Sequence, residues 1–232
     1  MTRERNSVAE AMLMVLFFVF IGAAAPAAGQ TVTDERVWMA VSVQGQLGTD
    51  SPWRWTSDWL VRARDGAGTL DFLAEQVMVT RDLTRQSGVG IGYAYGAGFP
   101  EAGSLREHLF VQQYTWSRGV NRRVALRSRL EERFVTGHPA MLLRVRQQVR
   151  VTWPLAARGG LQGVASDELF VQAGSTALTS PGLDSNHVFL GVGRTLTARS
   201  AMEIGYVNMY SRLGPNRRLC GHVMSATLAV SL

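Results

Sequence analysis

The sequence predicts an all-β fold, an antiparallel up-and-down β-barrel that crosses a membrane. Three observations predict it: an apolar run near the amino terminus, alternation of apolar and polar residues over much of the chain, and the lack of a helix-length apolar run after residue 29. A bilayer-crossing segment must satisfy its own backbone hydrogen bonds, so a chain without spanning helices crosses as a closed barrel.

The amino terminus has the three parts of a secretory signal peptide. Two arginines in MTRER precede the apolar run 11–25, and the small residues of AAAPAAG offer a cleavage site near Gly29. The run is shorter than the roughly 18 to 20 apolar residues of a spanning helix, and no basic cluster follows it, which favours cleavage over an uncleaved anchor. We therefore expect a cleaved signal peptide at 1–29 and a single β-barrel domain at 30–232.

The composition is basic and poor in cysteine. The formal net charge is +6, the sequence pI is about 10.4, and Cys220 is the single cysteine. A lone cysteine forms no intramolecular disulfide, and we interpret Cys220 as a small strand residue rather than as a reactive thiol. A basic chain often binds nucleic acid, but export would separate this one from nucleic acid.

Period-two alternation locates the strands. In LLRVRQQVRVTW (142–153) apolar residues alternate with arginines and glutamine, whereas a helix would scatter those arginines around its circumference. The same alternation appears in VWMAVSVQGQL, SGVGIGYAYG, MEIGYVNMY and VMSATLAVSL. With the turn signals between them, these runs predict strands at 36–47, 53–65, 69–80, 87–97, 105–118, 122–135, 141–153, 161–173, 185–196, 200–210 and 219–232.

These eleven segments conflict with the even strand numbers of bacterial outer-membrane barrels. We therefore expect twelve strands, with ten as the second choice, and one merged, missed or invented segment. The links at 119–121 and 197–200 are short, and those at 174–186 and 211–219 are longer. Because such barrels have short periplasmic turns, counting back from a periplasmic carboxyl terminus places the longer links outside.

Two neighbouring strands carry arginine at alternating positions, in LRSRLEERF (126–134) and in LLRVRQQVRV (142–151). An arginine that faced mid-bilayer lipid would cost about 2 to 4 kcal/mol, so we expect the arginines to face the lumen and the apolar residues between them to face lipid. The lumen-facing candidates are Glu107, Arg127, Arg129, Glu131, Arg133, Arg144, Arg146, Arg150 and Glu168.

Two further patterns fit a membrane barrel. Aromatic residues near strand ends are expected to form girdles at the membrane interfaces, and they are Trp55, Trp59, Tyr93, Tyr95, Tyr114, Trp116, Trp153, Tyr206 and Tyr210. A packed sandwich core is the other interpretation, but a sandwich would not also need so many arginines on its other face. The glycines of GVGIGYAYG are expected to be bare lumen-facing positions opposite large arginines, not a dinucleotide fingerprint, because no helix follows.

A series of short motifs adds a resemblance to a known family. The series is EHLFVQQY (107–114), RSRLEERF (127–134), LRVRQQVRVTWPL (143–155), DELFVQ (167–172) and EIGYVNMY (203–210). It resembles the proteobacterial family of outer-membrane barrel proteins catalogued as domain of unknown function 2490. The resemblance covers nearly all of the mature chain and is strongest from Glu107 onward. It implies an outer-membrane-type β-barrel and no established activity.

Inward arginines fit two functions. They could attract and select small anionic solutes, or Glu107, Glu131 and Glu168 could tie them into ion-pair ladders that plug the bore. The ladders are preferred because side chains fill the interior of small barrels. The predicted function is an outer-membrane, porin-like barrel of unknown specific activity with a narrow arginine-rich lumen. It is structural or weakly permeable, and anion-selective passage of small solutes stays open.

Two other classes of protein share part of this pattern. A secreted or periplasmic barrel could bind a hydrophobic ligand as lipocalins do, but inward arginines count against it. A barrel hydrolase needs a serine and a histidine in a recognisable motif, and none surrounds His108, His138, His187 or His222. We expect no enzyme, no cofactor and no metal, since no Cys/His cluster has metal-ligand spacing.

The expected location is the outer membrane of a Gram-negative bacterium. The expected partners are outer-membrane lipid and lipopolysaccharide, the barrel-assembly machinery during insertion, and small anionic solutes, but not nucleic acid. Arg212, Arg217 and Arg218, in the last long loop, are candidates for contact with lipopolysaccharide phosphates, and a solvated loop is the equal alternative.

Overall fold

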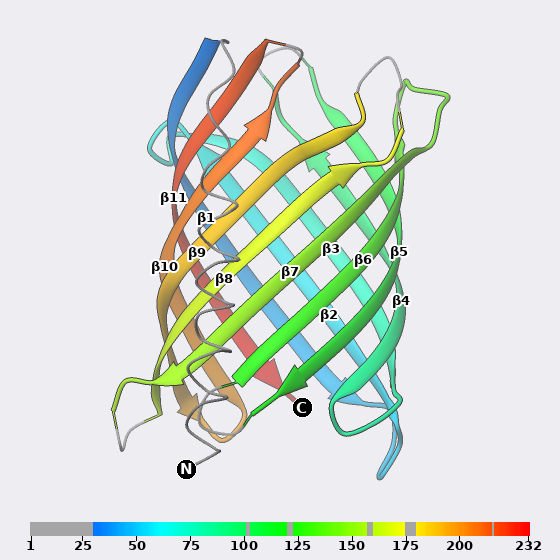
Figure 1. The fold of residues 1–232 in the computed structure, drawn as a ribbon, viewed down its shortest axis with the longest axis vertical. Coiled ribbons are helices and arrows are strands. Elements are labelled where there is room, and N and C mark those ends of the chain that lie inside the picture. Colours follow the sequence, from blue (N-terminus) through cyan, green and yellow to red (C-terminus); the bar gives the residue numbers. More distant parts are fainter. Residues whose placement is uncertain (1–29, 101–102, 120–122, 157–159, 175–179, 215) are drawn as a thin grey trace, which may run out of the picture. The chain divides into compact units, whose positions relative to one another are not determined.

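Eleven β-strands make up most of the chain that the computed structural model describes, which is residues 30–100, 103–119, 123–156, 160–174, 180–214 and 216–232. Figure 1 shows the strands, which are β1 (Gln30–Gln46), β2 (Trp53–Arg64), β3 (Thr69–Asp82), β4 (Ser87–Gly98), β5 (Leu105–Arg118), β6 (Arg123–Val135), β7 (Leu142–Pro154), β8 (Leu161–Gln172), β9 (Gly182–Thr197), β10 (Ser200–Arg212) and β11 (Arg217–Ser231). No helix in the described ranges is long and apolar enough to cross a membrane. The predicted signal peptide at 1–29 lies outside the described residues.

The strands form one closed ring. Each strand pairs antiparallel with the next in sequence, and β1 lies beside β11. An even number of reversals separates β1 from β11, so these two strands run in the same direction, as Figure 1 shows, and the closing pair is parallel. Near the ends of β1 and β11, Nε2 of Gln44 donates to Oγ of Ser231 at 3.1 Å, and the Gln44 carbonyl accepts from the N–H of Leu232 at 2.9 Å.

The ring corrects the predicted number of strands. The fold is an all-β closed barrel, as predicted, but the described residues form eleven strands rather than twelve or ten. The expectation of an even number assumes that the first and last strands meet antiparallel. Here they meet parallel, so an odd number closes the ring.

Most predicted strand boundaries lie close to the observed ones. The largest difference is at β1, which begins at Gln30 rather than at residue 36. The long loop predicted at 211–219 is wrong, because β10 and β11 extend into it and leave only the link 213–216. Arg212, Arg217 and Arg218 therefore lie at strand ends and not in a long loop.

Alternate residues of each strand face the interior and the outside. Arg150 of β7 pairs with Glu203 of β10, and two strands that are not neighbours can meet only across the interior. The outer face is mainly apolar, with Ile91 exposed by 70% and Leu190 by 61%. Polar side chains interrupt it in hydrogen-bonded pairs between neighbouring strands: Gln112 with Glu132, Ser128 with Gln147, and Asn186 with Asp167.

The predicted aromatic girdles are only partly correct. Trp55 and Trp153 lie close to strand ends, but Tyr93 and Tyr206 lie near the middle of β4 and β10. The hydroxyl of Tyr93 lies 2.6 Å from Nδ1 of His108 on β5. The hydroxyl of Tyr206 lies 2.5 Å from Nδ1 of His222 on β11. These two tyrosines therefore join the polar pairs of the outer face.

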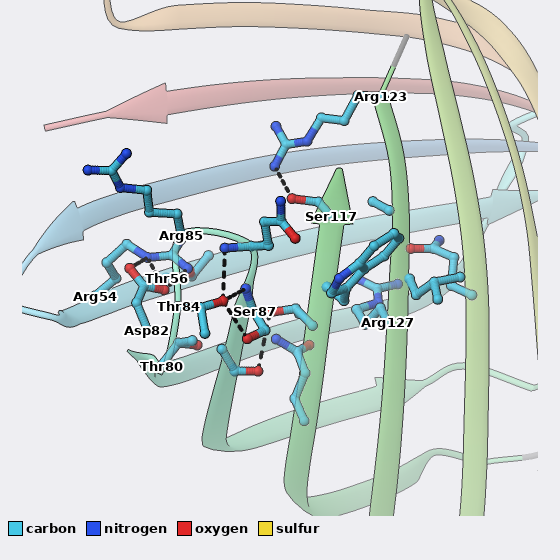
Figure 2. Close-up of a pocket in the computed structure, with 18 residues that line it drawn as sticks. Arg54, Thr56, Thr80, Asp82, Thr84, Arg85, Ser87, Ser117, Arg123 and Arg127 are labelled. Atoms are coloured by element: carbon cyan, nitrogen blue, oxygen red, sulfur yellow. Dashed lines mark hydrogen bonds and ion pairs between the residues drawn. The ribbon is translucent and has the colours of Figure 1, made fainter. Parts of the chain in front are cut away.

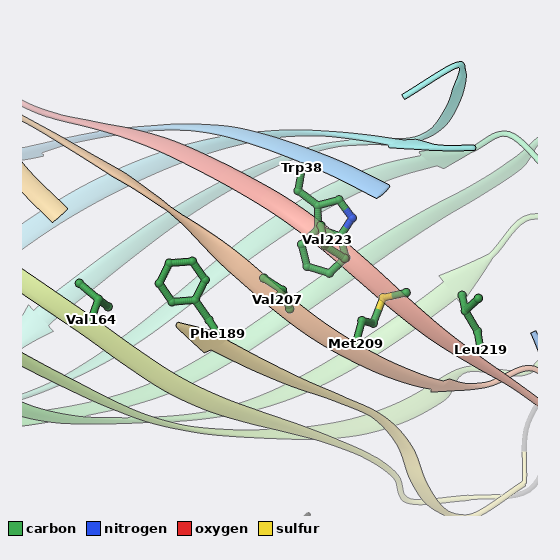
Figure 3. Packing of buried hydrophobic residues seen from close by; sticks show 7 residues of the cluster. All are labelled: Trp38, Val164, Phe189, Val207, Met209, Leu219 and Val223. Atoms are coloured by element: carbon green, nitrogen blue, oxygen red, sulfur yellow. The ribbon is translucent and has the colours of Figure 1, made fainter. Parts of the chain in front are cut away.

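Part of the interior is apolar. A cluster of buried residues from β1 and β8 to β11, shown in Figure 3, consists of Trp38, Val164, Phe189, Val207, Met209, Leu219 and Val223. A smaller cluster from β3, β4 and β5 consists of Met78, Ala94, Leu109 and Val111. These packed clusters narrow the barrel in addition to the charged side chains.

The glycines of β4 do not lie opposite arginines as predicted. A Cβ added at Gly92 would lie 3.0 Å from Cε of Met78, and one at Gly96 would lie 2.7 Å from Cζ of Phe72. Both contacts come from β3, the strand before β4 in the ring. Because these glycines have no side chain, they leave space for apolar side chains of the neighbouring strand.

Candidate functional site

The centre of the candidate site is a carboxylate held by two arginines. Strands β6 and β7 pair so that Glu131 lies opposite Arg144, and Arg129 lies opposite Arg146. The Glu131 side chain is only 1% exposed, and its two oxygens accept from Nε of Arg144 and Nη1 of Arg146, each at 2.7 Å. Hydrogen bonds between charged groups of this kind are stronger than neutral ones.

A second buried carboxylate continues the chain of ion pairs onto β8. Oε1 of Glu168 lies 3.0 Å from Nη2 of Arg127 and 2.9 Å from Nη2 of Arg146. Arg146 thus lies between Glu131 and Glu168, which explains how it can lie opposite another arginine in the strand register.

The remaining predicted site residues lie on the same inner face. Arg133 pairs with Glu107 at 2.5 Å, between β6 and β5. Arg150 pairs with Glu203, which the sequence did not single out as a site residue. All nine lumen-facing candidates therefore take part in side-chain hydrogen bonds or ion pairs. The nine are Glu107, Arg127, Arg129, Glu131, Arg133, Arg144, Arg146, Arg150 and Glu168.

A polar chain crosses the barrel from β6 to β1. Nη1 of Arg129 donates to Oε1 of Gln76 on β3 at 3.1 Å. Nε2 of Gln76 donates to Asp58 on β2 at 3.2 Å, and Asp58 accepts from Ser42 on β1 at 2.6 Å. The four side chains connect opposite walls, so they restrict the bore where they lie.

A second crossing chain is made of rings and guanidinium groups. The ring of His187 on β9 lies 4.6 Å from that of Phe170 and 5.1 Å from that of Trp38 on β1, measured between centroids. The guanidinium of Arg62 lies 4.2 Å from the Trp38 ring, and that of Arg146 lies 4.4 Å from the Phe170 ring. Such contacts between a cation and a ring stabilise both guanidinium groups, in Arg146 in addition to its two carboxylate partners.

Two interior arginines have no carboxylate partner among the described residues. Neither Arg62 nor Arg129 forms an ion pair within 4.0 Å in that part of the chain. Arg129 donates instead to two glutamines, and Nε of Arg62 is buried without a hydrogen-bond partner there. Both side chains line a cavity of about 690 Å³ inside the barrel.

One serine and one histidine meet inside the barrel. Oγ of Ser185 lies 3.0 Å from Nε2 of His187, but it also lies 2.7 Å from the carbonyl of Tyr210 and 2.8 Å from Oγ of Ser211. A hydroxyl has one proton, and three acceptors compete for it here. Within the described ranges no three His, Cys, Asp or Glu side chains are grouped as a metal site.

The sequence could have located more of the site than it did. Asp58, Arg62 and Gln76 lie on the inner faces of β2 and β3, and alternation with Trp59 and Val77 indicates that facing. No such local signal exists for the partners, because Arg129 meets Gln76 through the ring order of the strands.

Comparisons with known proteins supply a family model and no activity. The model, described as "Protein of unknown function (DUF2490)", matches residues 35–219. An uncharacterized protein of Methylorubrum extorquens is 26% identical over 223 residues, which cover 94% of this chain and 96% of that protein. A solved structure of the NanC porin is 12% identical with a TM-score of 0.46, and the match covers 78% of this chain and 93% of that one.

Proposed function

The chain belongs to the DUF2490 family of proteins of unknown function, and we propose from its own side chains that it is an outer-membrane β-barrel with its bore filled by arginines and carboxylates. In this function the barrel is structural or weakly permeable. The observation that carries the proposal is the hydrogen bond from Arg129 to Gln76, which joins β6 to β3 across the interior.

The outer face supports a lipid environment. Met39, Ile91, Phe110, Leu190 and Met224 are each more than half exposed, and they come from five different strands. A mainly apolar outer face of this kind is unfavourable in water and favourable in the hydrocarbon core of a bilayer. The polar side chains on this face share hydrogen bonds in pairs, which lowers the cost of placing them in lipid.

The interior supports closure rather than an open channel. Glu107, Glu131, Glu168 and Glu203 each pair with at least one arginine, so most of the arginine charge is neutralised within the wall. The same interior argues against a lipocalin-like barrel, because buried charges would line the space that a hydrophobic ligand needs. The competing acceptors around Ser185 argue likewise against a hydrolase.

Anion-selective passage is the second candidate, and one observation favours it. Arg62 and Arg129 carry charge that no carboxylate pairs with among the described residues, and both line the cavity of about 690 Å³. Guanidinium groups that line a cavity without a carboxylate partner attract anions.

Single-channel recording distinguishes the two functions. The protein, purified in neutral detergent after expression of the full chain, is inserted into a planar bilayer beside the variant Arg129→Ala/Arg144→Ala/Arg146→Ala. A silent native barrel and a conducting variant support the plug. A conducting native barrel whose anion preference disappears in the variant supports selective passage.

A matched control removes three arginines from outside the network, in Arg81→Ala/Arg194→Ala/Arg199→Ala. The control is expected to behave as the native barrel does. Equal conductance in all three proteins contradicts both functions. Recovery of the protein in the inner membrane or the periplasm, rather than the outer-membrane fraction, contradicts the proposed location.

A further inference from the structure

A second cavity, of about 470 Å³, lies at the end of the barrel where β3 and β5 finish and β4 and β6 begin (Figure 2). It is separate from the cavity of about 690 Å³ described above, although Arg127 is among the lining residues of both cavities. The smaller cavity has many hydroxyl groups in its lining, which are those of Thr56, Thr80, Thr84, Ser87, Thr115 and Ser117.

The charge of this second cavity is unbalanced. Its lining contains Arg54, Arg85, Arg123 and Arg127, and Asp82 is the single carboxylate among the lining residues. That carboxylate is already bound by Arg54, whose Nε and Nη2 lie 2.9 and 2.6 Å from its oxygens. Three guanidinium groups are therefore left without a carboxylate in the cavity.

The donors of two of those three groups are largely available. Nη2 of Arg123 donates to the neutral hydroxyl of Ser117 at 3.0 Å, and Arg85 forms no side-chain bond to any part of the chain that the structure describes. Nη2 of Arg127 pairs with Glu168, and its Nε is buried out of reach of a ligand in the cavity. Arg85 and Arg123 are therefore the two arginines of the lining whose charge is not matched by a carboxylate among the described residues.

The turn that carries Arg85 is held in place by its own hydrogen bonds. Oγ1 of Thr84 accepts from the N–H groups of Gln86 and Ser87 at 3.1 and 3.0 Å, and the N–H of Leu83 donates to the Ser87 carbonyl at 2.9 Å. Arg85 therefore starts from a fixed backbone, which lowers the entropy lost when its side chain binds a ligand.

We propose that this cavity binds a small, multiply charged oxyanion of the phosphate type, with the guanidinium groups of Arg85 and Arg123 as its charged donors. Guanidinium groups match the oxygens of phosphate with paired hydrogen bonds, and the surrounding hydroxyls donate to the remaining oxygens. The site needs only the folded barrel. It does not depend on whether the central network conducts or plugs.

Inorganic phosphate is the probe that tests the proposal. It is titrated calorimetrically into the full-chain protein in neutral detergent, beside the variants Arg85→Ala/Arg123→Ala and Arg194→Ala/Arg199→Ala. The second variant removes the same charge from positions outside the cavity lining. Binding is expected to weaken about tenfold or more in the first variant and to stay within about twofold of native in the second.

Two outcomes of the titration overturn the site. Equal weakening in both variants means that phosphate senses the net charge of the barrel and not this cavity. Binding to anionic short-chain phospholipid but not to inorganic phosphate assigns the arginines to lipid headgroups.

Two controls keep the result interpretable. Heat-modifiable electrophoretic mobility checks that each variant is folded, and Arg123→Lys, which keeps the charge, is expected to retain part of the affinity. Because no conductance is measured, a failure to bind phosphate leaves the function of the central network untouched.

Discussion

The guanidinium of Arg129 on β6 donates a hydrogen bond of 3.1 Å to the side-chain oxygen of Gln76 on β3, three strands away around the ring. The Arg129 side chain also donates to Gln113 at 2.7 Å, and only 8% of the residue is exposed. A buried cation is thus held by two neutral amides rather than by a carboxylate. The stability of the barrel depends on those amides, because a buried guanidinium without acceptors is costly.

Replacing Gln76 by leucine tests this dependence. The change leaves Arg129 with one amide acceptor and removes a donor from Asp58, so we expect a loss of about 1 to 3 kcal/mol in the free energy of unfolding. Urea unfolding in phospholipid vesicles measures it. Gln147→Leu is the control, because Gln147 bonds Ser128 on the outer face, and a larger loss there than at Gln76 contradicts the crossing hydrogen bond.

Two adjacent glutamates of β6 provide a matched comparison. Glu131 faces inward and binds two arginines, whereas Glu132 faces outward and accepts from Gln112 at 3.2 Å. Glu131→Gln leaves buried positive charge without its partner, so we expect a loss of about 3 to 5 kcal/mol in unfolding free energy. Glu132→Gln is expected to cost less than about 1 kcal/mol. Similar losses for the two variants contradict the network.

The pair of Arg150 and Glu203 allows a charge exchange across the barrel. Arg150→Glu alone brings two carboxylates together and is expected to destabilise the fold, while adding Glu203→Arg restores the attraction. The expected coupling energy in a double-mutant cycle is roughly 1 to 3 kcal/mol. The exposed pair of Arg54 and Asp82 is the reference, with an expected coupling below about 1 kcal/mol, and the reverse order contradicts the prediction.

Leucine-to-arginine substitutions test the lipid environment. Leu190 lies near the middle of β9 and is 61% exposed, and Leu83 lies in the link between β3 and β4 and is 52% exposed. In phospholipid vesicles, Leu190→Arg is expected to cost about 2 to 4 kcal/mol of unfolding free energy and Leu83→Arg no more than about 1 kcal/mol. If both variants lose equally little unfolding free energy, the apolar outer face of the barrel is in contact with water and not with lipid.

The sequence predicts well on which face of a strand a residue lies and which adjacent strands pair. The facing of Arg144 and Arg146 follows from strand alternation, and the pairing of their strand with β6 follows from the short link between them. The apolar inner walls escape such a prediction because Val207 and Val223 share a face with small and polar residues, so alternation alone gives their facing but not their packing.

The partners of the charged residues are beyond local patterns. Arg150 and Glu203 are 53 positions apart, and they meet because of the tilt and order of the strands around the ring. The predicted strand count was wrong for a similar reason. Nothing in the sequence of β1 or β11 tells whether these two strands meet parallel or antiparallel.

That parallel junction makes the two ends of the barrel sequence depend on each other. Gln44 and Ser231 are 187 positions apart, so a very long loop must close before the ring does, and closure is slow compared with the pairing of adjacent hairpins. Parallel pairing is also slightly weaker per residue. We therefore expect the amide hydrogens of β1 and β11 along this junction to exchange before those of the antiparallel strand pairs. A nascent chain that lacks β11 would leave two open strand edges, which a bilayer does not tolerate.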